Sequence, residues 1–541
     1  MGKAALLAGA ASMLGRFSGL ARDIVFTAFF GAGATADAFL AAFRVPNLFR
    51  ELLAEGTLAN VFVPIFAETG EREGWQRAAA LANAMLGILL LILGAVTLLF
   101  FVFAEQFVTL VAAGFLDNPD KFDLTVWLTR WLAPFLAGLS IASFFGGMLN
   151  VRGRFFLPAL APSILNLFTI IACVLGEPWE RWTGLPAIGA VALASTLSGV
   201  ATAAVQYPVL RKVGFRFRPH LRGDPKLKRV AAFVGAALIS VAVVQFNHLV
   251  ETQIASRFGD GPVSWLVLGF RLVQIPQSVF SGSVAVAALA GVSLLLARGE
   301  KVQARDGLCR ALELNSLLVL PSAVGMFMLA DPLIRIFFER GEFTATDTVA
   351  TASVLRMYAV ATFGICTYRV LLPAFFALQD PYAPMRVSLV AMAAKLPIAL
   401  GMVYTLDLGI AGLPLSHAVT VTGEVAVLAW MLSSRMNGWA PGFWSQHLRM
   451  LVASALMALV LHLLRPWADG PALLVVIGIG AAVYGLAAML LGVRETRTLL
   501  IKILIKLRLY RGPPPPGMGP PPPGMGPPPP GMGPPPPGMG G

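Results

Sequence analysis

The sequence contains little charge. Only 13% of its 541 residues are Asp, Glu, Lys or Arg, whereas 57% are hydrophobic, and the mean hydropathy is +0.76. A soluble domain carries about 25% charged residues, because its surface must face water. The composition therefore excludes a soluble globular protein and indicates an integral membrane protein.

Cysteine and histidine are also scarce. Cys173, Cys309 and Cys366 fall inside apolar runs without C-x-x-C spacing, and the five histidines are scattered. His248 and His417 lie within apolar runs, where a packing role is the simpler interpretation. A disulfide framework, a structural metal or a metal-dependent enzyme needs such residues, or carboxylates, at close spacing. The sequence therefore indicates no metal, no cofactor and no catalytic group, and we expect the protein not to be an enzyme.

Long apolar runs dominate what is present. No stretch alternates apolar and polar residues, which excludes a transmembrane barrel. A helix needs about 20 apolar residues to cross a bilayer, and the chain contains about 14 such runs. Their approximate cores are residues 5–29, 37–66, 79–103, 125–149, 158–176, 187–210, 230–256, 263–296, 311–337, 350–377, 385–405, 409–433, 448–464 and 471–492.

Positive charge is concentrated in alternate connections between these runs. The richest connection, RKVGFRFRPHLRGDPKLKR, covers residues 211–229. Because cytoplasmic loops of membrane proteins are enriched in Lys and Arg, we expect these connections and both termini to lie in the cytoplasm. The same bias accounts for the net charge of +13, so we expect no nucleic-acid partner.

Two segments of the chain resemble each other. FFGAGATADAFLAAFRV (29–45) and RFGDGPVSWLVLGFRLV (257–273) both place F-G-x-G at a turn and F-R in the next run, so that Arg44 corresponds to Arg271. The second copy begins an even number of runs after the first, as in parallel repeats, which commonly enclose a central cavity. The sequence therefore predicts an all-α polytopic membrane protein, with two parallel repeats of about six helices around a cavity and two C-terminal helices.

This pattern divides the chain into parts. The last of them repeats PPPPGMG and cannot bury a core. The expected parts are an N-terminal repeat (1–210), a basic cytoplasmic linker (211–229), a C-terminal repeat (230–435), two final helices (436–493), a basic amphipathic segment on the inner leaflet (494–511) and a disordered tail (512–541).

Charged residues interrupt the first two apolar runs. They are Arg16, Arg22, Asp23, Asp37, Arg44 and Arg50. Each costs about 2.5 to 3.5 kcal/mol near a membrane helix centre, so they must face protein or water. Buried ion pairs are one explanation. With Arg271, however, arginines outnumber Asp23, Asp37 and Glu55, and the guanidinium group binds phosphate oxygens in a bidentate manner. An amphiphile with a phosphate or diphosphate head is the ligand that this surplus favours.

The second run also contains helix-breaking residues. Pro46 removes a backbone donor, and Gly56 follows it. We expect this span to be broken beside the cavity.

Several motifs identify a family. The stretch GRFSGLARD…GAGATADAF…RVPNLFRELLAEGTLANVFVPIFAE closely resembles the MurJ (MviN) family of lipid II flippases, within the superfamily of multidrug and toxin exporters and polysaccharide flippases. FFGGMLNVRGRFFLPALAPSILN, GPVSWLVLGFRLVQIP and FFERGEFTATD agree, and the resemblance covers about residues 1–500. It implies transport of lipid II, the undecaprenyl-diphosphate-linked peptidoglycan precursor, from the inner to the outer leaflet of the bacterial cytoplasmic membrane by alternating access.

The resemblance also implies roles for individual residues. It places the diphosphate-binding arginines at Arg22, Arg50 and Arg271. Other substrate-binding positions are Arg16, Asp23, Asp37, Asn47, Glu55 and Asn166. Two residues depart from the family pattern: Gly15 stands where several relatives have serine, and Glu51 where many have a second basic residue. The two final helices are expected to form a groove for the polyprenyl tail.

Other functions remain open at this point. A multidrug exporter or another polyprenyl-diphosphate oligosaccharide flippase of the same superfamily is the alternative. Lipid II and membrane lipids are the expected partners, and cell wall synthesis proteins are further candidates. Asp380 and Lys395 could be linked to a coupling ion, although a loop carboxylate and a lysine that snorkels to the interface are the simpler interpretations.

Overall fold

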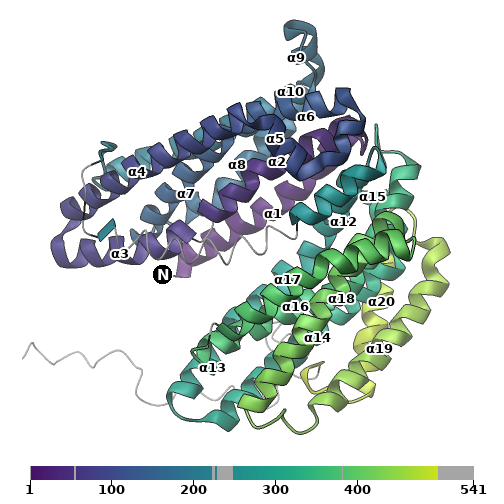
Figure 1. The fold of residues 1–541 in the computed structure, drawn as a ribbon. Helices are drawn as coiled ribbons and strands as arrows, with labels where there is room; N and C mark the ends of the chain where they lie inside the picture. The colour runs from purple at the N-terminus through teal and green to yellow at the C-terminus, as the bar shows by residue number, and fades with distance from the viewer. Residues whose placement is uncertain are drawn as a thin grey trace, which may run out of the picture.

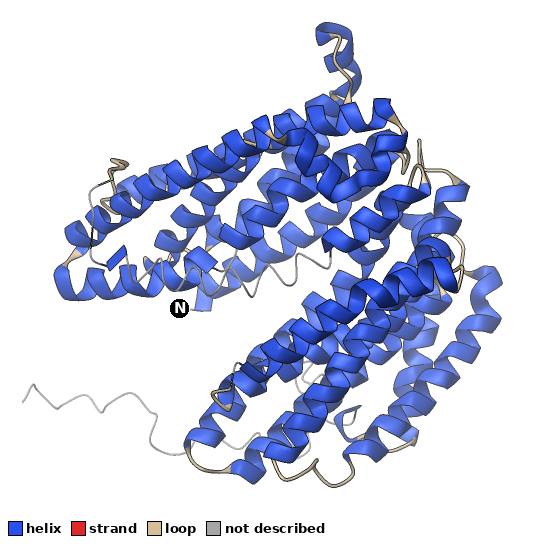
Figure 2. Cartoon of the chain, in the orientation of Figure 1, coloured by secondary structure: helices blue, strands red, loops and turns tan. Residues whose placement is uncertain are grey.

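The computed structural model describes residues 2–53, 57–221, 224, 226–227, 248–380 and 382–496. All the regular secondary structure in these residues is helical (Figures 1 and 2). The prediction of an all-α protein is confirmed. Of the expected basic segment 494–511, residues 497–511 lie outside the described residues, and so does the tail 512–541.

The first helices form one group, the N-terminal lobe (Figure 1). Its helices are α1 (Gly2–Phe30), α2 (Ala34–Leu53), α3 (Thr57–Glu73), α4 (Trp75–Val102), α5 (Ala104–Ala112), α6 (Pro119–Leu132), α7 (Phe135–Val151), α8 (Phe156–Val174), α9 (Gly176–Thr183) and α10 (Ile188–Lys212).

The remaining helices form a second group, the C-terminal lobe, which begins with a helical segment at residues 248–255. Its other helices are α12 (Pro262–Pro276), α13 (Gly282–Ala297), α14 (Lys301–Met328), α15 (Ala330–Phe338), α16 (Ala345–Ala377), α17 (Tyr382–Leu400), α18 (Gly412–Arg435), α19 (Phe443–Leu464) and α20 (Ala472–Leu490).

Eleven helical segments of the described chain are long and apolar enough to cross a membrane. They coincide with the expected runs except 5–29, 37–66 and 230–256. The first of these runs is helical in α1, and residues 230–247 lie outside the described part of the chain. The structure therefore confirms a polytopic membrane fold, while the number of 14 spans stays a prediction.

The second expected span is described as two helices, α2 and α3. Pro46 lies inside α2, which continues to Leu53, so the helix does not end at the proline. Residues 54–56, including Gly56, lie outside the described residues. A further interruption occurs between α12 and α13, where residues 277–281 form a π-helical turn directly after Pro276. Such turns are frequent at functional sites in helical proteins.

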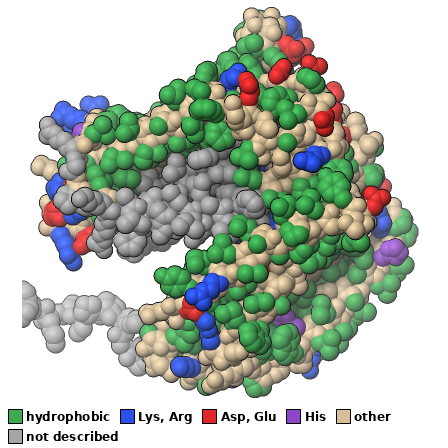
Figure 3. Space-filling view, viewed as in Figure 1, with side chains coloured by type: hydrophobic (Ala, Val, Ile, Leu, Met, Phe, Trp, Pro, Cys, Tyr) green, Lys and Arg blue, Asp and Glu red, His purple; other side chains and the backbone are tan. Residues whose placement is uncertain are grey.

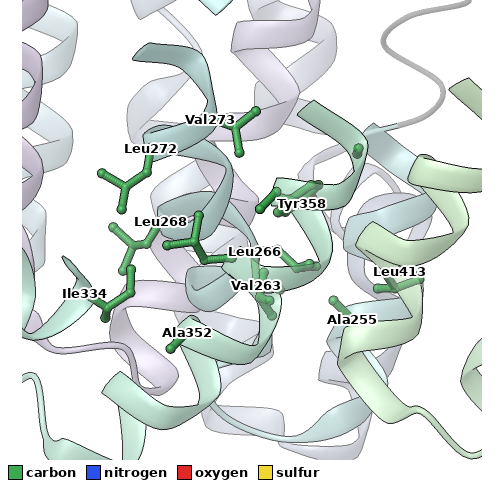
Figure 4. Close-up of a cluster of buried hydrophobic side chains, with 14 of the residues drawn as sticks. Ala255, Val263, Leu266, Leu268, Leu272, Val273, Ile334, Ala352, Tyr358 and Leu413 are labelled. Atoms are coloured by element: carbon green, nitrogen blue, oxygen red, sulfur yellow. The ribbon is translucent and has the colours of Figure 1, made fainter. Parts of the chain in front are cut away.

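Apolar packing fixes α12 in the C-terminal lobe. Leu266, Leu268 and Leu272 of α12 are buried in one cluster with Ile334 of α15 and Tyr358 of α16 (Figure 4). Burying a leucine side chain stabilises the fold by roughly 1.5 to 3 kcal/mol. The cluster therefore holds α12 in a fixed position, with its opposite face available to the space between the lobes.

The two lobes meet at one end of the molecule, which we call the closed end. It contains the turn 31–33, residues 113–118, residues 256–261 and residues 339–344. Backbones approach closely there: Glu342 N donates to Ala28 O at 3.0 Å, and a Cβ built on Gly341 would lie 2.0 Å from the same oxygen. The opposite end, where α3 joins α4 and the N-terminus lies, is the open end (Figure 1).

Candidate functional site

A cavity of about 860 Å³ lies between the lobes. Residues of α1, α2, α8, α12 and α16 line it, together with the π-helical turn 277–281. Figure 3 shows a hollow between the two lobes on the viewed face. Among the candidates from the sequence, six line this cavity: Arg16, Arg22, Asp23, Asn47, Asn166 and Arg271.

Arginine dominates the charge of the cavity wall. Five arginines line it: Arg16, Arg22, Arg44, Arg271 and Arg369. The only acidic residues among its described lining residues are Asp23 and Glu251. A surplus of guanidinium groups in a partly dehydrated space attracts an anion, because the low local dielectric strengthens the interaction.

Three of these charged groups are in direct contact. Arg22 Nη2 donates to Asp23 Oδ1 at 2.6 Å, and Arg271 Nε lies 2.7 Å from Asp23 Oδ2. The second contact is an ion pair without the angle of a hydrogen bond. One carboxylate from α1 thus balances two guanidinium groups, one from each lobe. The unbalanced positive charge lies at the boundary between the lobes.

Asn166 fixes the position of α1 against α8. Its Nδ2 donates to Gly15 O at 3.1 Å and to Ser18 Oγ at 2.9 Å. A Cβ on Gly15 would lie 3.5 Å from the Pro162 side chain, an ordinary van der Waals distance, so the packing here does not explain the departure at Gly15. Asn166 positions the helix that carries Arg16 and Arg22.

Asp37 does not line the cavity. It is fully buried at the closed end, where its Oδ2 accepts from Lys121 Nζ at 3.0 Å and from Gly261 N at 2.8 Å. Its Oδ1 accepts from the backbone N of Ser264 at 2.8 Å and from the Ser264 hydroxyl at 2.7 Å. This carboxylate joins α2 and α6 of one lobe to the start of α12 in the other.

The structure leaves two candidates without a described side chain. The Arg50 backbone belongs to α2, but its side chain lies outside the described atoms, and Glu55 lies outside the described residues altogether. Their roles stay predictions.

Sequence reasoning missed a buried charged cluster beside the cavity. Lys395 is only 3% exposed and donates to Glu251 Oε1 at 2.7 Å, so the interpretation of a snorkelling lysine is wrong. Asp380 is a loop carboxylate, as expected, and pairs with Arg435 at 2.6 Å. Glu251 and Lys395 lie far apart in sequence, so no local pattern could have paired them. The presence of Glu251 and Lys395 inside apolar runs was the one feature of the sequence that could have indicated this cluster.

Comparisons with known proteins agree with this architecture. The family model described as Lipid II flippase MurJ matches residues 26–476. A probable lipid II flippase MurJ of Bdellovibrio bacteriovorus is 32% identical over 441 residues, covering 81% of this chain and 83% of that protein. A probable lipid II flippase MurJ of Rhizobium tropici is 32% identical over 510 residues, covering 90% of this chain and 93% of that protein.

A solved structure of a lipid II flippase MurJ in an inward closed conformation has a TM-score of 0.76 at 22% identity, and covers 92% of this chain and 100% of that chain. An inward-facing multidrug transporter of the MATE family has a TM-score of 0.62 at 14% identity, and covers 80% of this chain and 98% of that chain. These two likenesses concern the fold alone. Taken with the family model, they leave one assignment: the chain is a multi-pass inner-membrane transporter that belongs to the lipid II flippase MurJ family.

Proposed function

We propose that the cavity binds the diphosphate of lipid II and that the protein carries this lipid from the inner to the outer leaflet for peptidoglycan synthesis. The observation that carries the proposal is the arginine surplus around Asp23. Arg22 and Arg271 share this one carboxylate, and both line the cavity. A diphosphate would supply the anionic oxygens that the wall lacks, and guanidinium groups hold such oxygens in paired hydrogen bonds.

Alternating access follows from the position of the charges. Arg22 belongs to α1 and Arg271 to α12, so a bound diphosphate would contact both lobes. The closed end is held by the Asp37 contacts, and the cavity lies between it and the open end. Transport requires the lobes to separate at the closed end and to approach at the open end, while the arginines keep hold of the head group.

The orientation is part of the proposal. Connections 31–33, 113–118 and 256–261 of the closed end are those expected outside the cell, whereas the basic linker is expected inside. Residues of this linker pack against the start of α4: Arg218 N donates to Asn83 Oδ1 at 2.7 Å. We infer that both termini are cytoplasmic and that this conformation opens toward the cytoplasm.

The remaining parts receive matching roles. We assign residues 1–210 and 230–435 to the two moving repeats and residues 436–493 to a groove for the polyprenyl tail. Helices α19 and α20 pack against each other and contact α14, and leucines such as Leu456, Leu459 and Leu474 are exposed. An apolar surface inside the membrane suits a lipid tail. Cell wall synthesis proteins are candidate partners of the cytoplasmic linker and tail.

Rival functions make different demands on the cavity. An exporter of cationic drugs needs aromatic and acidic groups where this wall has arginine. A transferase acting on polyprenyl phosphate needs a metal site or a general base at the reacting atoms. Five arginines against Asp23 and Glu251 make the described wall unsuited to a cationic drug, and no group of metal ligands occurs among the described residues, so transport of an anionic head group fits this wall better than either rival.

The direct experiment is genetic replacement. The endogenous lipid II flippase is depleted from a host while this chain is expressed, and lipid II at the outer surface is measured by cleavage with an externally added enzyme. Restored exposure of lipid II supports the proposal. Growth arrest with lipid II retained inside, in cells that contain normal amounts of this protein, would contradict it.

The orientation is tested by labelling single cysteines. Trp182 in α9 is 87% exposed, and a cysteine there should react with an impermeant reagent in intact spheroplasts. A cysteine at Gly512 should react only after the membrane is opened. Labelling of position 512 from outside would overturn the assignment of the termini.

A further inference from the structure

A second group of charged residues extends from the cavity wall into the C-terminal lobe, and Glu251 and Tyr358 of this group line the cavity. Lys395 of α17 donates to Glu251 Oε1 at 2.7 Å, and its Nζ lies 3.2 Å from Nδ1 of His417 in α18. The Tyr358 hydroxyl of α16 lies 3.4 Å from Glu251 Oε2. Burying an ion pair carries a large desolvation cost, and apolar side chains of similar volume commonly serve stability as well. The stability of the fold therefore does not explain why these charged residues are buried here, which points to a functional role of the cluster.

His248 connects this cluster to the cavity. Its Nδ1 lies 3.6 Å from Glu251 Oε2, 29% of its side chain is exposed, and it lines the cavity. A proton on this ring would face a carboxylate. A proton on His417 would face the Lys395 ammonium, and like charges at that distance oppose each other. His248 is therefore the member of the cluster best placed to exchange a proton with water in the cavity.

Arginines line the same cavity as His248. The His248 ring packs edge-on against Phe270, at 5.9 Å between centroids, and Phe270 precedes Arg271 in α12. Arg44 of α2 lines the same cavity. In the empty cavity these guanidinium groups oppose a further positive charge. A bound diphosphate would neutralise them, so diphosphate and proton should each strengthen the binding of the other.

The same helical segment contributes to the closed end. Two residues after Glu251, the side chain of Gln253 accepts from Ala113 N at 2.7 Å, and Ser256 Oγ accepts from Gly114 N at 3.0 Å. A change in the charges around Glu251 therefore acts on a segment that holds the lobes together. Protonation beside Glu251 would in this way be coupled to the separation of the lobes.

We propose that His248, supported by Glu251 and Lys395, is a proton-binding site and that one proton enters the cavity with each lipid diphosphate. The proton passes from cavity water to the imidazole ring and returns to water when the diphosphate leaves, and no other bond forms or breaks. The resulting imidazolium pairs with Glu251, whose other oxygen stays bound to Lys395. This proposal rests on the proposed function, because it requires a diphosphate in the cavity.

The test measures diphosphate affinity against pH in the full-length protein in nanodiscs. The probe is undecaprenyl-diphospho-N-acetylglucosamine, a diphosphate diester that has no proton to lose between the two pH values used. We expect wild-type affinity to be about tenfold higher near pH 6 than near pH 8, because the proton and the diphosphate should each strengthen the binding of the other. The quantity compared between variants is the ratio of the affinity near pH 6 to the affinity near pH 8. A substitution that weakens binding equally at both pH values leaves this ratio unchanged.

Two variants and one control decide the outcome. His248→Gln should bring the ratio to about one, and Glu251→Gln should lower it, because the imidazolium loses its carboxylate partner. His462→Gln, which changes an exposed histidine of α19, should keep the wild-type ratio. An unchanged pH ratio in His248→Gln would overturn the proton site while leaving the proposed function intact. Absence of binding by the wild type at both pH values would instead overturn the proposed function and the proton site with it.

Discussion

Asp37 and Lys121 form a buried ion pair, with Nζ 3.0 Å from Oδ2. Lys121 also donates to Gly259 O at 3.1 Å and to Asp260 at 2.9 Å, and its ammonium lies 4.1 Å from the centroid of the Phe115 ring. Since Asp37 and Lys121 belong to the N-terminal lobe and residues 259–264 to the C-terminal lobe, the pair links the two lobes at the closed end. Opening that end exposes or separates these charges.

We therefore predict that Asp37→Asn weakens the closed end. The asparagine side chain would place an NH2 group where the Asp37 carboxylate now accepts hydrogen bonds. Removal of one partner of a buried ion pair also costs about 3 to 5 kcal/mol in stability. Spin labels at cysteines replacing Trp182 and Val349, which are both well exposed, should move apart in this variant. The exposed neighbour of Lys121 supplies the control, because Asp120→Asn should leave the label distance unchanged. An unchanged distance in Asp37→Asn would contradict the role of the Asp37–Lys121 pair in holding the closed end together.

A glycine pair tests how close the backbones must come. A Cβ on Gly114 would lie 2.4 Å from Ser256 O and 2.5 Å from Arg257 N, whereas one on Gly33 would meet nothing within 4 Å. Gly114→Ala should therefore displace the closed end and reduce lipid II flipping several-fold at normal protein levels, and Gly33→Ala should behave as wild type. Flipping assays on both variants in the complemented host make the comparison. Full activity of Gly114→Ala would mean that the close contact is dispensable.

The basic linker gives a pH-dependent prediction. The hydrogen bond from Lys226 holds the pKa of the Glu73 carboxyl below its usual value of 4.5, and Arg77 adds to this effect. A carboxyl group whose pKa is lower in the folded state stabilises the fold when the pH is above its pKa in the unfolded state. This stabilisation is lost as the pH falls through its pKa in the folded state. The protection of residues 215–221 against hydrogen exchange, relative to the intrinsic rate at each pH, should thus stay high at neutral pH and fall only below about pH 4.5.

The same measurement includes its own comparison. Glu73→Gln should show low protection of this segment at every pH, whereas Glu71→Gln, at an exposed neighbouring position, should follow the wild type. Identical exchange in Glu73→Gln and wild type would show that the linker is held by other contacts, such as Arg218 N to Asn83.

The C-terminal tail should be dispensable for transport. Residues 512–541 consist of PPPPGMG repeats, which have no side chains able to form a core. Deletion after Arg511 should leave flipping unchanged, and any defect should appear in the location of the protein in the cell. Loss of flipping in an abundant truncated protein would assign the tail to the transport machinery.

The sequence predicted the cavity better than it predicted the closed end. Arg44 and Arg271 correspond in the repeated motif, and both line the cavity, because matching positions of parallel repeats face the same central space. Asp37, which the family resemblance places among the substrate-binding positions, lies seven residues before Arg44. The helix carries it out of the cavity instead, to Lys121, a partner 84 residues away. Contacts between distant segments leave no periodic pattern in one sequence.

The central claim is that Arg271 binds the diphosphate. Lysine at this position would keep the positive charge and lose the planar guanidinium, so Arg271→Lys should impair flipping severely while protein abundance stays near normal. If Arg271 only joined helices through Asp23, lysine would be tolerated moderately, and alanine would lower abundance, because Asp23 would lose its partner in the other lobe. Arg257→Lys, at an exposed position of the closed end, is the matched control.

The decisive measurement therefore quantifies lipid II flipping and protein level in the same cells for Arg271→Lys, Arg271→Ala and Arg257→Lys. We predict that both Arg271 variants accumulate normally and fail to expose lipid II, while Arg257→Lys matches the wild type. Wild-type flipping by Arg271→Lys, or a loss of flipping in proportion to a loss of protein, would contradict the role of Arg271 in diphosphate binding.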